Sequence, residues 1–308
     1  MKKSALVAGG AGFIGSHLVD HLTKRDYTVT VIDNLVTGQR KNIHHLLSNG
    51  VRLLEADINE PLNLSEKFDE IYNLASPASP VDFDTMPMFI LKTGVDGHRN
   101  LLDKAKADGS RILFASTSEV YGDPLKHPQD ESYFGNVNCR GPRACYDEAK
   151  RVGETLTMIY QKHHQVDTRT VRIFNTYGPR MRLDDGRIVP NFFKQALAGE
   201  PLTIHGDGEQ TRSFCYVSDL VEGIFLTMQS DCTEPINLGS VFEFKVKDFA
   251  SQVLKLTRSR SSLEFLPARQ DDPLQRRPDI SRAETLLGWS PKVALEDGLL
   301  KTLEYFSN

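Results

Sequence analysis

The chain has few of the residue patterns that build disulfide bridges or metal sites. Its four cysteines form neither a C-x-x-C pair nor a zinc-ligand spacing. They are Cys139, Cys145, Cys215 and Cys232. The histidine pairs at 44–45 and 163–164 also lack ligand partners at metal spacing. We therefore expect four reduced thiols, no metal ion and a cytoplasmic location.

Long apolar runs and long basic runs are missing as well. No apolar stretch approaches the roughly 20 residues that a membrane-spanning helix needs. The short run from Ala5 to Ala8 is too brief for a signal peptide, so we expect no membrane anchor. The 37 basic and 41 acidic residues give a formal net charge of −4. Without a basic run, this charge argues against nucleic acid as a partner.

What the sequence does contain is the composition of a globular protein with its own core. Its 308 residues, 39% hydrophobic and 25% charged, suffice for one large or two small domains. Short apolar runs in the first half alternate with helix-length segments, which predicts βαβ units and a parallel sheet, an α/β fold. The apolar runs are residues 4–8, 28–32, 51–55, 70–74 and 111–116, and the clearest helical segments are 17–24 and 92–107.

The second half is less regular. A further strand is expected at 168–173, after a helical stretch at 146–163. Beyond it, clusters of Gly, Pro and polar residues suggest the loops of a smaller substrate lobe. We therefore divide the chain into domains at 1–176 and 177–308, with segments near 214–238 returning to the first domain.

A glycine-rich turn follows the first expected strand. Gly9, Gly12 and Gly15 form the pattern G-x-x-G-x-x-G, and a helix is expected to open at Ser16. Glycines permit a tight turn from strand to helix and let backbone N–H groups approach a pyrophosphate. The helix N-terminus adds partial positive charge under that group. The turn therefore predicts a dinucleotide site.

Carboxylates at the ends of later strands indicate which dinucleotide binds. Asp33 ends the second strand, 18 residues after Gly15. A carboxylate there can accept hydrogen bonds from a ribose diol and repels a 2′-phosphate, which favours NAD. Arg40 follows closely and keeps NADP as an alternative. Asp57 closes the third strand and could reach the adenine, although it could also simply cap a loop.

The pattern for chemistry is a Tyr and a Lys four residues apart. Tyr146 and Lys150 share one face of the expected helix. A nearby ammonium favours the phenolate, which lowers the phenol pKa and lets the Tyr act as a general base. Upstream, residues 116–122 place hydroxyl groups directly after a strand, where they should lie beside the cofactor.

Together, in this order, these motifs resemble the extended short-chain dehydrogenase/reductases that act on nucleotide sugars, over essentially the whole chain. The resemblance implies a Rossmann-type doubly wound parallel sheet with a smaller C-terminal substrate-binding lobe. It also implies NAD as cofactor and Thr117, Tyr146 and Lys150 as a catalytic trio. The cofactor residues that it implies are Gly9, Gly12, Phe13, Ile14, Gly15, Asp33, Asn34, Asp57, Ile58, Leu74, Ser76, Thr93, Tyr146, Lys150 and Thr176.

Within that family, Ser118-Glu119 and the segment 270–280 resemble the UDP-glucuronate decarboxylase branch, which makes UDP-xylose. In that branch an Arg at the position of Arg276 faces the sugar and its carboxylate. A UDP-sugar is therefore the expected small-molecule partner. The substrate residues implied are Pro77, Ser79, Lys92, Glu119, Asn175, Arg187, Asn191, Gln210, Arg212 and Arg276.

The implied reaction assigns a role to each catalytic residue. Oxidation at C4 turns the uronate into a β-keto acid, which loses CO₂ readily, and NAD stores the hydride until the end. Tyr146 would remove the C4 hydroxyl proton, Lys150 would lower the pKa of Tyr146, and Thr117 would orient O4. Arg276 would bind the substrate, and Glu119 would position sugar hydroxyls or assist reprotonation of C5.

Two other functions stay open at this point. One is a nucleotide-sugar 4-epimerase or 4,6-dehydratase on the same scaffold, against which Glu119 and Arg276 argue. The other is a non-catalytic NAD-binding module, against which the intact trio argues. A homodimer is expected through a four-helix seam of the helices at 92–107 and 146–163. The apolar side chains expected to supply contact there are Ile90, Leu91, Val95, Leu101, Leu102, Leu156, Ile159 and Tyr160. The alternative is that they pack only on their own sheet.

Overall fold

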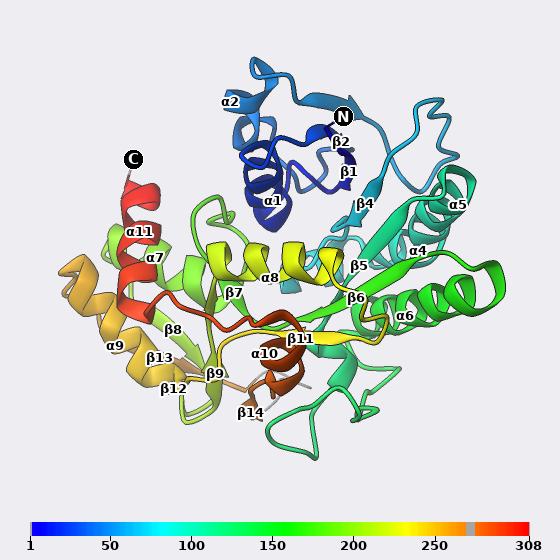
Figure 1. Ribbon diagram of the computed structural model, residues 1–308. Coiled ribbons are helices and arrows are strands. Elements are labelled where there is room, and N and C mark those ends of the chain that lie inside the picture. The colour runs from blue at the N-terminus through cyan, green and yellow to red at the C-terminus, as the bar shows by residue number, and fades with distance from the viewer. Residues whose placement is uncertain (1, 269–274, 308) are drawn as a thin grey trace.

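The computed structural model describes residues 2–268 and 275–307. Its centre is a seven-stranded sheet with the order β11-β6-β5-β4-β1-β2-β3, and every neighbouring pair of strands is parallel (Figure 1). The predicted doubly wound α/β fold is thereby confirmed. In chain order the strands are β1 Ser4–Ala8, β2 Thr28–Asp33, β3 Arg52–Glu55, β4 Glu70–Asn73, β5 Arg111–Thr117, β6 Thr168–Ile173 and β11 Ile236–Leu238.

The central strands are buried on both faces, which is why they appear in the sequence as nearly continuous apolar runs. Helices α1 and α8 pack together against one face, and α4, α5 and α6 cover the other (Figure 1). Their bounds are α1 Phe13–Thr23, α8 Val217–Gln229, α4 Pro87–Lys92, α5 His98–Asp108 and α6 Ala144–His164. Two shorter helices are α2 His44–Leu47 and α3 Pro80–Thr85.

Several boundaries differ from the sequence-based expectation. Helix α1 begins at Phe13 rather than at Ser16, because Gly12 already occupies the N-cap position. The single helix expected at 92–107 is instead α4, a π-helical turn at Thr93–Gly97, and α5. Pro87 begins α4, since its fixed backbone angle suits the first turn of a helix.

Part of the seam prediction needs a correction, whereas the half-buried Leu91, Val95, Leu156 and Ile159 leave the rest of it a prediction. Ile90, Leu101, Leu102 and Tyr160 are buried within their own subunit, in clusters beneath the sheet-covering helices. They are therefore unavailable to a partner. The larger apolar side chains exposed on α4 and α6 are instead Met88, Val152 and Met158.

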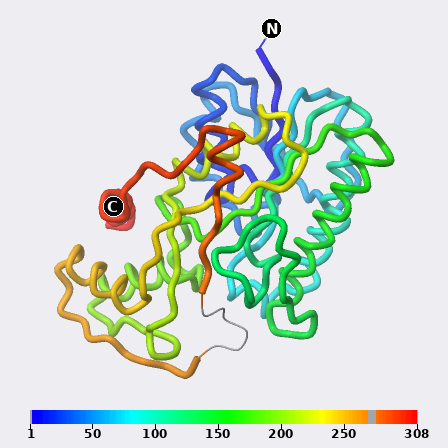
Figure 2. The backbone as a smooth tube through the Cα atoms, turned by 60° about the horizontal axis from the view of Figure 1, so that its bottom comes forward, coloured from blue at the N-terminus to red at the C-terminus, as the bar shows by residue number. Residues whose placement is uncertain are grey.

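A smaller lobe follows β6. In Figure 2 its yellow-green and orange segments lie on one side of the molecule, and the blue-to-green strands and helices of the sheet lie on the other. Three short sheets build it, β10-β7, β12-β9-β14 and β13-β8. Its strands are β7 Thr176–Tyr177, β8 Leu202–His205, β9 Thr211–Ser213, β10 Cys215–Tyr216, β12 Glu243–Lys245, β13 Leu263–Leu266 and β14 Gln275–Arg276. Its helices are α7 Ile188–Ala198, α9 Val246–Thr257, α10 Ser281–Leu287 and α11 Leu295–Ser307.

Two kinds of site are missing from the described part of the chain. No helix within residues 2–268 and 275–307 is long and apolar enough to cross a membrane. The same residues contain no group of three His, Cys, Asp or Glu side chains that could hold a metal ion.

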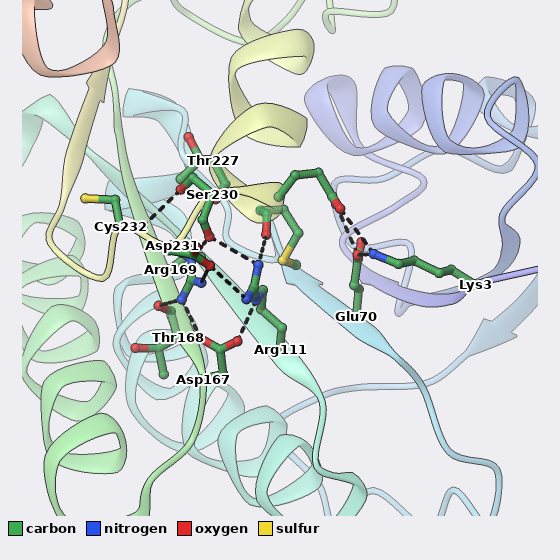
Figure 3. A network of polar contacts seen from close by, with 12 residues as sticks. Lys3, Glu70, Arg111, Asp167, Thr168, Arg169, Thr227, Ser230, Asp231 and Cys232 are labelled. Atoms are coloured by element: carbon green, nitrogen blue, oxygen red, sulfur yellow. Dashed lines mark hydrogen bonds and ion pairs between the residues drawn. The ribbon is translucent and has the colours of Figure 1, made fainter. Parts of the chain in front are cut away.

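Polar contacts fasten α8 at the amino edge of the sheet (Figure 3). Arg111, the first residue of β5, donates from Nη1 to the carbonyls of Met228 at 2.9 Å and Ser230 at 3.1 Å. Arg169 on β6 donates from Nε to the same Ser230 carbonyl at 2.7 Å. The last carbonyls of a helix lack partners within it and carry partial negative charge, so two guanidinium groups stabilise this end of α8.

The buried Arg169 allows a direct test of this network. Replacing Arg169 by Met should lower the free energy of unfolding by about 2–3 kcal/mol, because buried carbonyls lose a charged donor. Arg52→Met is the matched control, since Arg52 pairs with Glu66 at the surface and should change stability by less than about 1 kcal/mol. Urea unfolding measures both variants, and equal midpoints would contradict the assignment.

Candidate active site

One large pocket lies at the carboxyl edge of the sheet. It is bounded by the segments that follow β1, β4, β5 and β6, and it encloses a cavity of about 360 Å³. The strand order reverses between β1 and β4, and a crevice at such a point is where open α/β sheets bind ligands. Every cofactor and catalytic residue expected from the sequence lines this pocket, and so does every expected substrate residue except Lys92.

The glycine turn forms one end of the pocket. Gly9 has a left-handed φ of +76°, and a Cβ there would lie 2.8 Å from the Ala75 backbone. A Cβ on Gly15 would overlap the Gly9 carbonyl oxygen. Gly12 caps α1 without any side chain in front of the helix N-terminus. The exposed N–H groups of that terminus fit a pyrophosphate, as the sequence predicted.

Besides the ribose contact that the sequence predicts, the Asp33 side chain also holds nearby backbone N–H groups. Its Oδ2 accepts a hydrogen bond from the Ala11 N–H and its Oδ1 accepts one from the Leu35 N–H, both at 2.9 Å. Burial raises the pKa of this carboxyl, and the two hydrogen bonds oppose the increase. The side chain thus fixes the loop around the glycine turn while lining the pocket where a ribose would bind. Nearby, Asn34 Nδ2 donates to Asp57 Oδ2 at 3.2 Å.

The remaining cofactor residues expected from the sequence line the pocket from the glycine turn towards the catalytic residues. Two threonines among them are held by backbone carbonyls. Thr93 donates to Phe89 at 2.8 Å, and Thr176 donates to Phe174 at 2.9 Å. A glycine cradle and a buried carboxylate at one end of a long pocket fit a dinucleotide. The other residues of the wall are Phe13, Ile14, Ile58, Leu74 and Ser76.

Tyr146 and Lys150 lie where the Tyr-Lys spacing predicted, on the buried face of α6. The Phe83 ring stacks on the Tyr146 ring at 5.1 Å between centroids. Lys150 Nζ donates to the Ala115 carbonyl at 2.8 Å and lies 5.7 Å from the Tyr146 ring centroid. The pair therefore adjoins the end of β5, where Thr117 also lines the pocket.

The expected lowering of the Tyr146 pKa by Lys150 is not among the effects that the structure shows, and it stays a prediction. Burial raises the pKa of Tyr146 to about 12, and the hydrogen bond with Thr117 and the charge of Arg187 only partly oppose this. Burial also lowers the pKa of Lys150 to about 8. Removal from water is therefore the largest influence on the pKa of each group. The cation that does lower the pKa of Tyr146 is Arg187.

Glu119 lies between two arginines at the catalytic end. Its Oε1 contacts Arg276 Nη1, and its Oε2 is 2.7 Å from Arg143 Nη2. These guanidinium groups lower the pKa of Glu119 to about 2, although burial alone would raise it. Arg276 is 3% exposed, and its Nε has no hydrogen-bond partner among the described residues. Arg276 therefore keeps one buried donor unpaired within the described part of the chain.

The opposite end of the pocket carries polar groups from the small lobe. Asn175 Nδ2 is buried without a partner among the described residues. Arg212 on β9 is buried at the wall, which suits contact with a phosphate. Gln210 donates to the His205 carbonyl at 2.6 Å. Asn191 lies on the pocket side of α7, in its first turn.

The loop after β4 meets the small lobe at the sugar side of the pocket. Ser79 caps α3 and donates to the Asp185 carbonyl, and Pro77 lines the wall beside it. The Asp185 carboxylate accepts hydrogen bonds from Arg187. Asp185 therefore holds the Arg187 guanidinium in one orientation, from which its charge acts on Tyr146.

Lys92 does not meet its expectation as a substrate residue. Its ammonium lies 3.2 Å from Glu60, and its side chain is 46% exposed, outside the pocket lining. Conversely, sequence reasoning gave no role to Arg143, which precedes Tyr146 by three residues and so faces the same site. The first part of the segment 270–280 lies outside the described residues.

The Glu119 contacts predict a pH-dependent stability. Glu119→Gln should lower the free energy of unfolding near pH 7 by about 3–5 kcal/mol, because Arg276 loses its buried partner. The native pKa is depressed, so this stabilisation exists above the ordinary value of 4.5 and is lost as pH falls towards about 2. The deficit of the variant should therefore shrink on acidification.

Urea unfolding at about pH 7, 4 and 3 measures this deficit. Glu60→Gln is the control, because its partner Lys92 lies at the surface, and its effect should stay below about 1 kcal/mol. A deficit that is independent of pH would contradict the assignment.

Comparison with known proteins agrees with this geometry. Residues 5–239 match the NAD dependent epimerase/dehydratase family. UDP-glucuronic acid decarboxylase 1 of Danio rerio is 52% identical over 307 residues, which are 99% of this chain and 73% of that protein. UDP-glucuronic acid decarboxylase 2 of Arabidopsis thaliana is 52% identical over 295 residues, 96% of this chain and 66% of that protein.

A solved structure shows the same architecture with ligands. UDP-glucuronic acid 4-epimerase from Bacillus cereus, in complex with UDP-glucuronic acid and NAD, is 31% identical to this chain. The TM-score is 0.89, and the match covers 99% of each chain. The pocket, its glycine turn and these similarities lead to one conclusion: the chain belongs to the NAD dependent epimerase/dehydratase family.

Proposed function

We propose that this chain decarboxylates UDP-glucuronate to UDP-xylose with NAD as a cofactor that ends each cycle unchanged. The observation that carries the proposal is the buried Arg276 guanidinium, which lines the pocket beside the catalytic residues and whose Nε has no hydrogen-bond partner among residues 2–268 and 275–307. A planar cation with an unused donor suits a sugar carboxylate. The decarboxylases named above, about half identical to this chain, support the same substrate.

The chemistry explains why two groups of the sugar must be held at once. A carboxylate on C5 is hard to expel because the C5 carbanion is unstable. Bound NAD supplies a hydride acceptor for C4 and returns the hydride at the end. With a ketone at C4, the electron pair left by CO₂ enters an enolate. Thr117 and Tyr146 would therefore hold O4 while Arg276 holds the carboxylate.

Tyr146 moves the O4 proton in this proposal. Its pKa of about 12 without ligands keeps the phenol protonated, so a cation must favour the phenolate during the reaction. Arg187 already acts in that direction, and the Lys150 ammonium lies 5.7 Å from the centroid of the Tyr146 ring. The Thr117 hydroxyl would form a hydrogen bond with the sugar oxygen O4 and so orient it towards Tyr146.

The rest of the substrate would bind along the small lobe. Arg212 would contact the diphosphate, and Asn175, Gln210 and Asn191 would supply hydrogen bonds to the nucleotide and sugar. Pairing through α4 and α6 remains a proposal too, and Met88, exposed by 74%, is an apolar side chain available there. A homodimer across this face would cover it. A cytoplasmic location stays a prediction.

The proposal is tested by incubating the purified protein with UDP-glucuronate and NAD. Mass spectrometry should show a nucleotide sugar that is lighter by one CO₂, without net NADH, because the hydride returns to C4. Proton NMR then identifies the pentose. An unchanged mass with new stereochemistry would make the chain an epimerase, and bound NAD without conversion would favour a binding module.

The role of Arg276 is tested by Arg276→Lys. The variant loses the planar contact, so kcat/KM should fall by about 10- to 100-fold, equivalent to about 1.5–3 kcal/mol for a charged hydrogen bond. Arg277→Lys is the control, because Arg277 is adjacent but lies 3.6 Å from Glu243, outside the pocket lining. Equal activity of both variants would remove Arg276 from the mechanism.

A further inference from the structure

Decarboxylation consumes a proton, and this inference rests on the proposed function. The C5–C6 bond breaks, C6 leaves as CO₂, and the electron pair forms an enolate that must gain a proton at C5. Tyr146 takes a proton from O4 and returns it, so it supplies none on balance. Each turnover therefore takes up one proton from solvent, and the site needs a group that stores it.

A second cavity lies behind the catalytic end. It measures about 230 Å³, and Glu119, Arg143 and Arg276 line both this cavity and the large pocket. The rest of its wall comes from the start of α6 and from the loop that precedes α6. In Figure 1 that loop lies near β14, and a bridge from Gln129 to Pro278 joins it to the segment that follows β14. Its other lining residues are Gly122, Asp123, Asn136, Val137, Asn138 and Asp147.

The cavity reaches the surface through the loop. Asp123, Asn136 and Asn138 are exposed lining residues. A polar cavity of this size has room for several waters, because one water occupies about 30 Å³ in the liquid. Protons can therefore enter from solvent along this side without crossing the nucleotide-binding wall.

Asp147 is the buried carboxyl in this cavity. It directly follows Tyr146 on α6, is 6% exposed, and its Oδ1 has no hydrogen-bond partner among the described residues. A buried carboxylate without a donor is costly, whereas the protonated carboxyl is neutral. The side chain can thus carry a proton at a position that opens on the cavity.

The charges around Asp147 favour this protonated form. Burial and, after it, the charge of Glu119 raise its pKa to about 7. Arg143 and Arg276 only partly oppose this increase, and Glu148 adds a smaller one. Asp123 adds a further carboxylate at the cavity wall. Glu119, by contrast, stays ionised between its arginines. Two neighbouring carboxyl groups thus differ in protonation near neutral pH.

We propose that the second cavity is the proton-uptake route of the reaction and that Asp147 stores the proton that replaces the departing carboxyl group at C5. The ionised Glu119, on the wall between the two cavities, orients the water that carries this proton. As C5 gains the proton, the C4 carbonyl re-forms from the enolate. Water in the second cavity then reprotonates Asp147. Asp147 thus stores the proton, which reaches C5 through the water that Glu119 orients.

Asp147→Asn tests this step because Asn keeps the shape and cannot release the proton. Turnover with UDP-glucuronate should fall by about 100-fold, the lower range for loss of a general acid. The initial formation of NADH in a single turnover should stay near the wild-type rate, and NADH should then persist while C5 waits for a proton. Stopped-flow absorbance and mass spectrometry follow the two steps.

The pH profile separates proton storage from a structural role. Wild-type turnover should fall as pH rises past about 7, because Asp147 loses its proton there, and this limb should be absent in the variant. Glu148→Gln is the control, since Glu148 adjoins Asp147 but pairs with Arg151 at 3.6 Å. It should retain near-wild-type turnover and keep the alkaline limb, shifted at most slightly to lower pH because the Glu148 charge contributes less to the pKa of Asp147 than burial, Glu119 or the two arginines do.

Val137→Phe provides an independent variant should Asp147→Asn fold poorly. It narrows the cavity from the loop and should slow turnover while sparing NADH formation. If both variants lose oxidation and turnover equally, or lose neither, the proton route is wrong although UDP-glucuronate is still decarboxylated by the wild type. A wild type that releases no CO₂ would instead contradict the proposed function itself.

Discussion

The contact of Glu119 with two arginines is the interaction on which the catalytic end depends. Glu119 follows β5, Arg143 precedes α6, and Arg276 lies on β14, which pairs with β9 of the small lobe. One buried carboxylate thus joins three parts of the chain and closes the small lobe on the sheet. Buried charges are tolerated only when they are paired, so the contacts that close the pocket also fix the charges used for chemistry.

The features that depend on local spacing could be predicted from the sequence. The glycine turn requires residues without a Cβ, and Gly9 and Gly15 are positions where any Cβ would meet backbone atoms. Tyr146 and Lys150 share a helix face because their spacing matches one helical turn. The parallel sheet followed from the alternation of apolar runs and helical segments. The ends of β2, β4, β5 and β6 then brought Asp33, Ser76, Thr117 and Asn175 to one edge of the sheet.

Features that depend on long-range packing could not be predicted in this way. The pKa of Tyr146 depends on how completely the ring is buried and on Arg187, from a distant loop. Lys92 pairs with Glu60, which lies 32 residues earlier in the chain and outside the pocket lining. Arg143 and Asp147 stand beside a recognised motif, but only the folded loop and β14 show what they face. Spacing cannot reveal such environments.

Arg276 lies late in the chain, so it is synthesised after the strands of the central sheet. All seven strands of the central sheet, and with them the glycine turn, are complete once residue 238 has been made. Arg276 is synthesised only later, and domains generally fold as units from the N-terminal side. The cofactor wall is therefore complete in the chain before the residue that is proposed to hold the sugar carboxylate. Its core is not, because Trp289, which follows Arg276, packs in the same core as β1 and donates to the Asp219 carbonyl on α8.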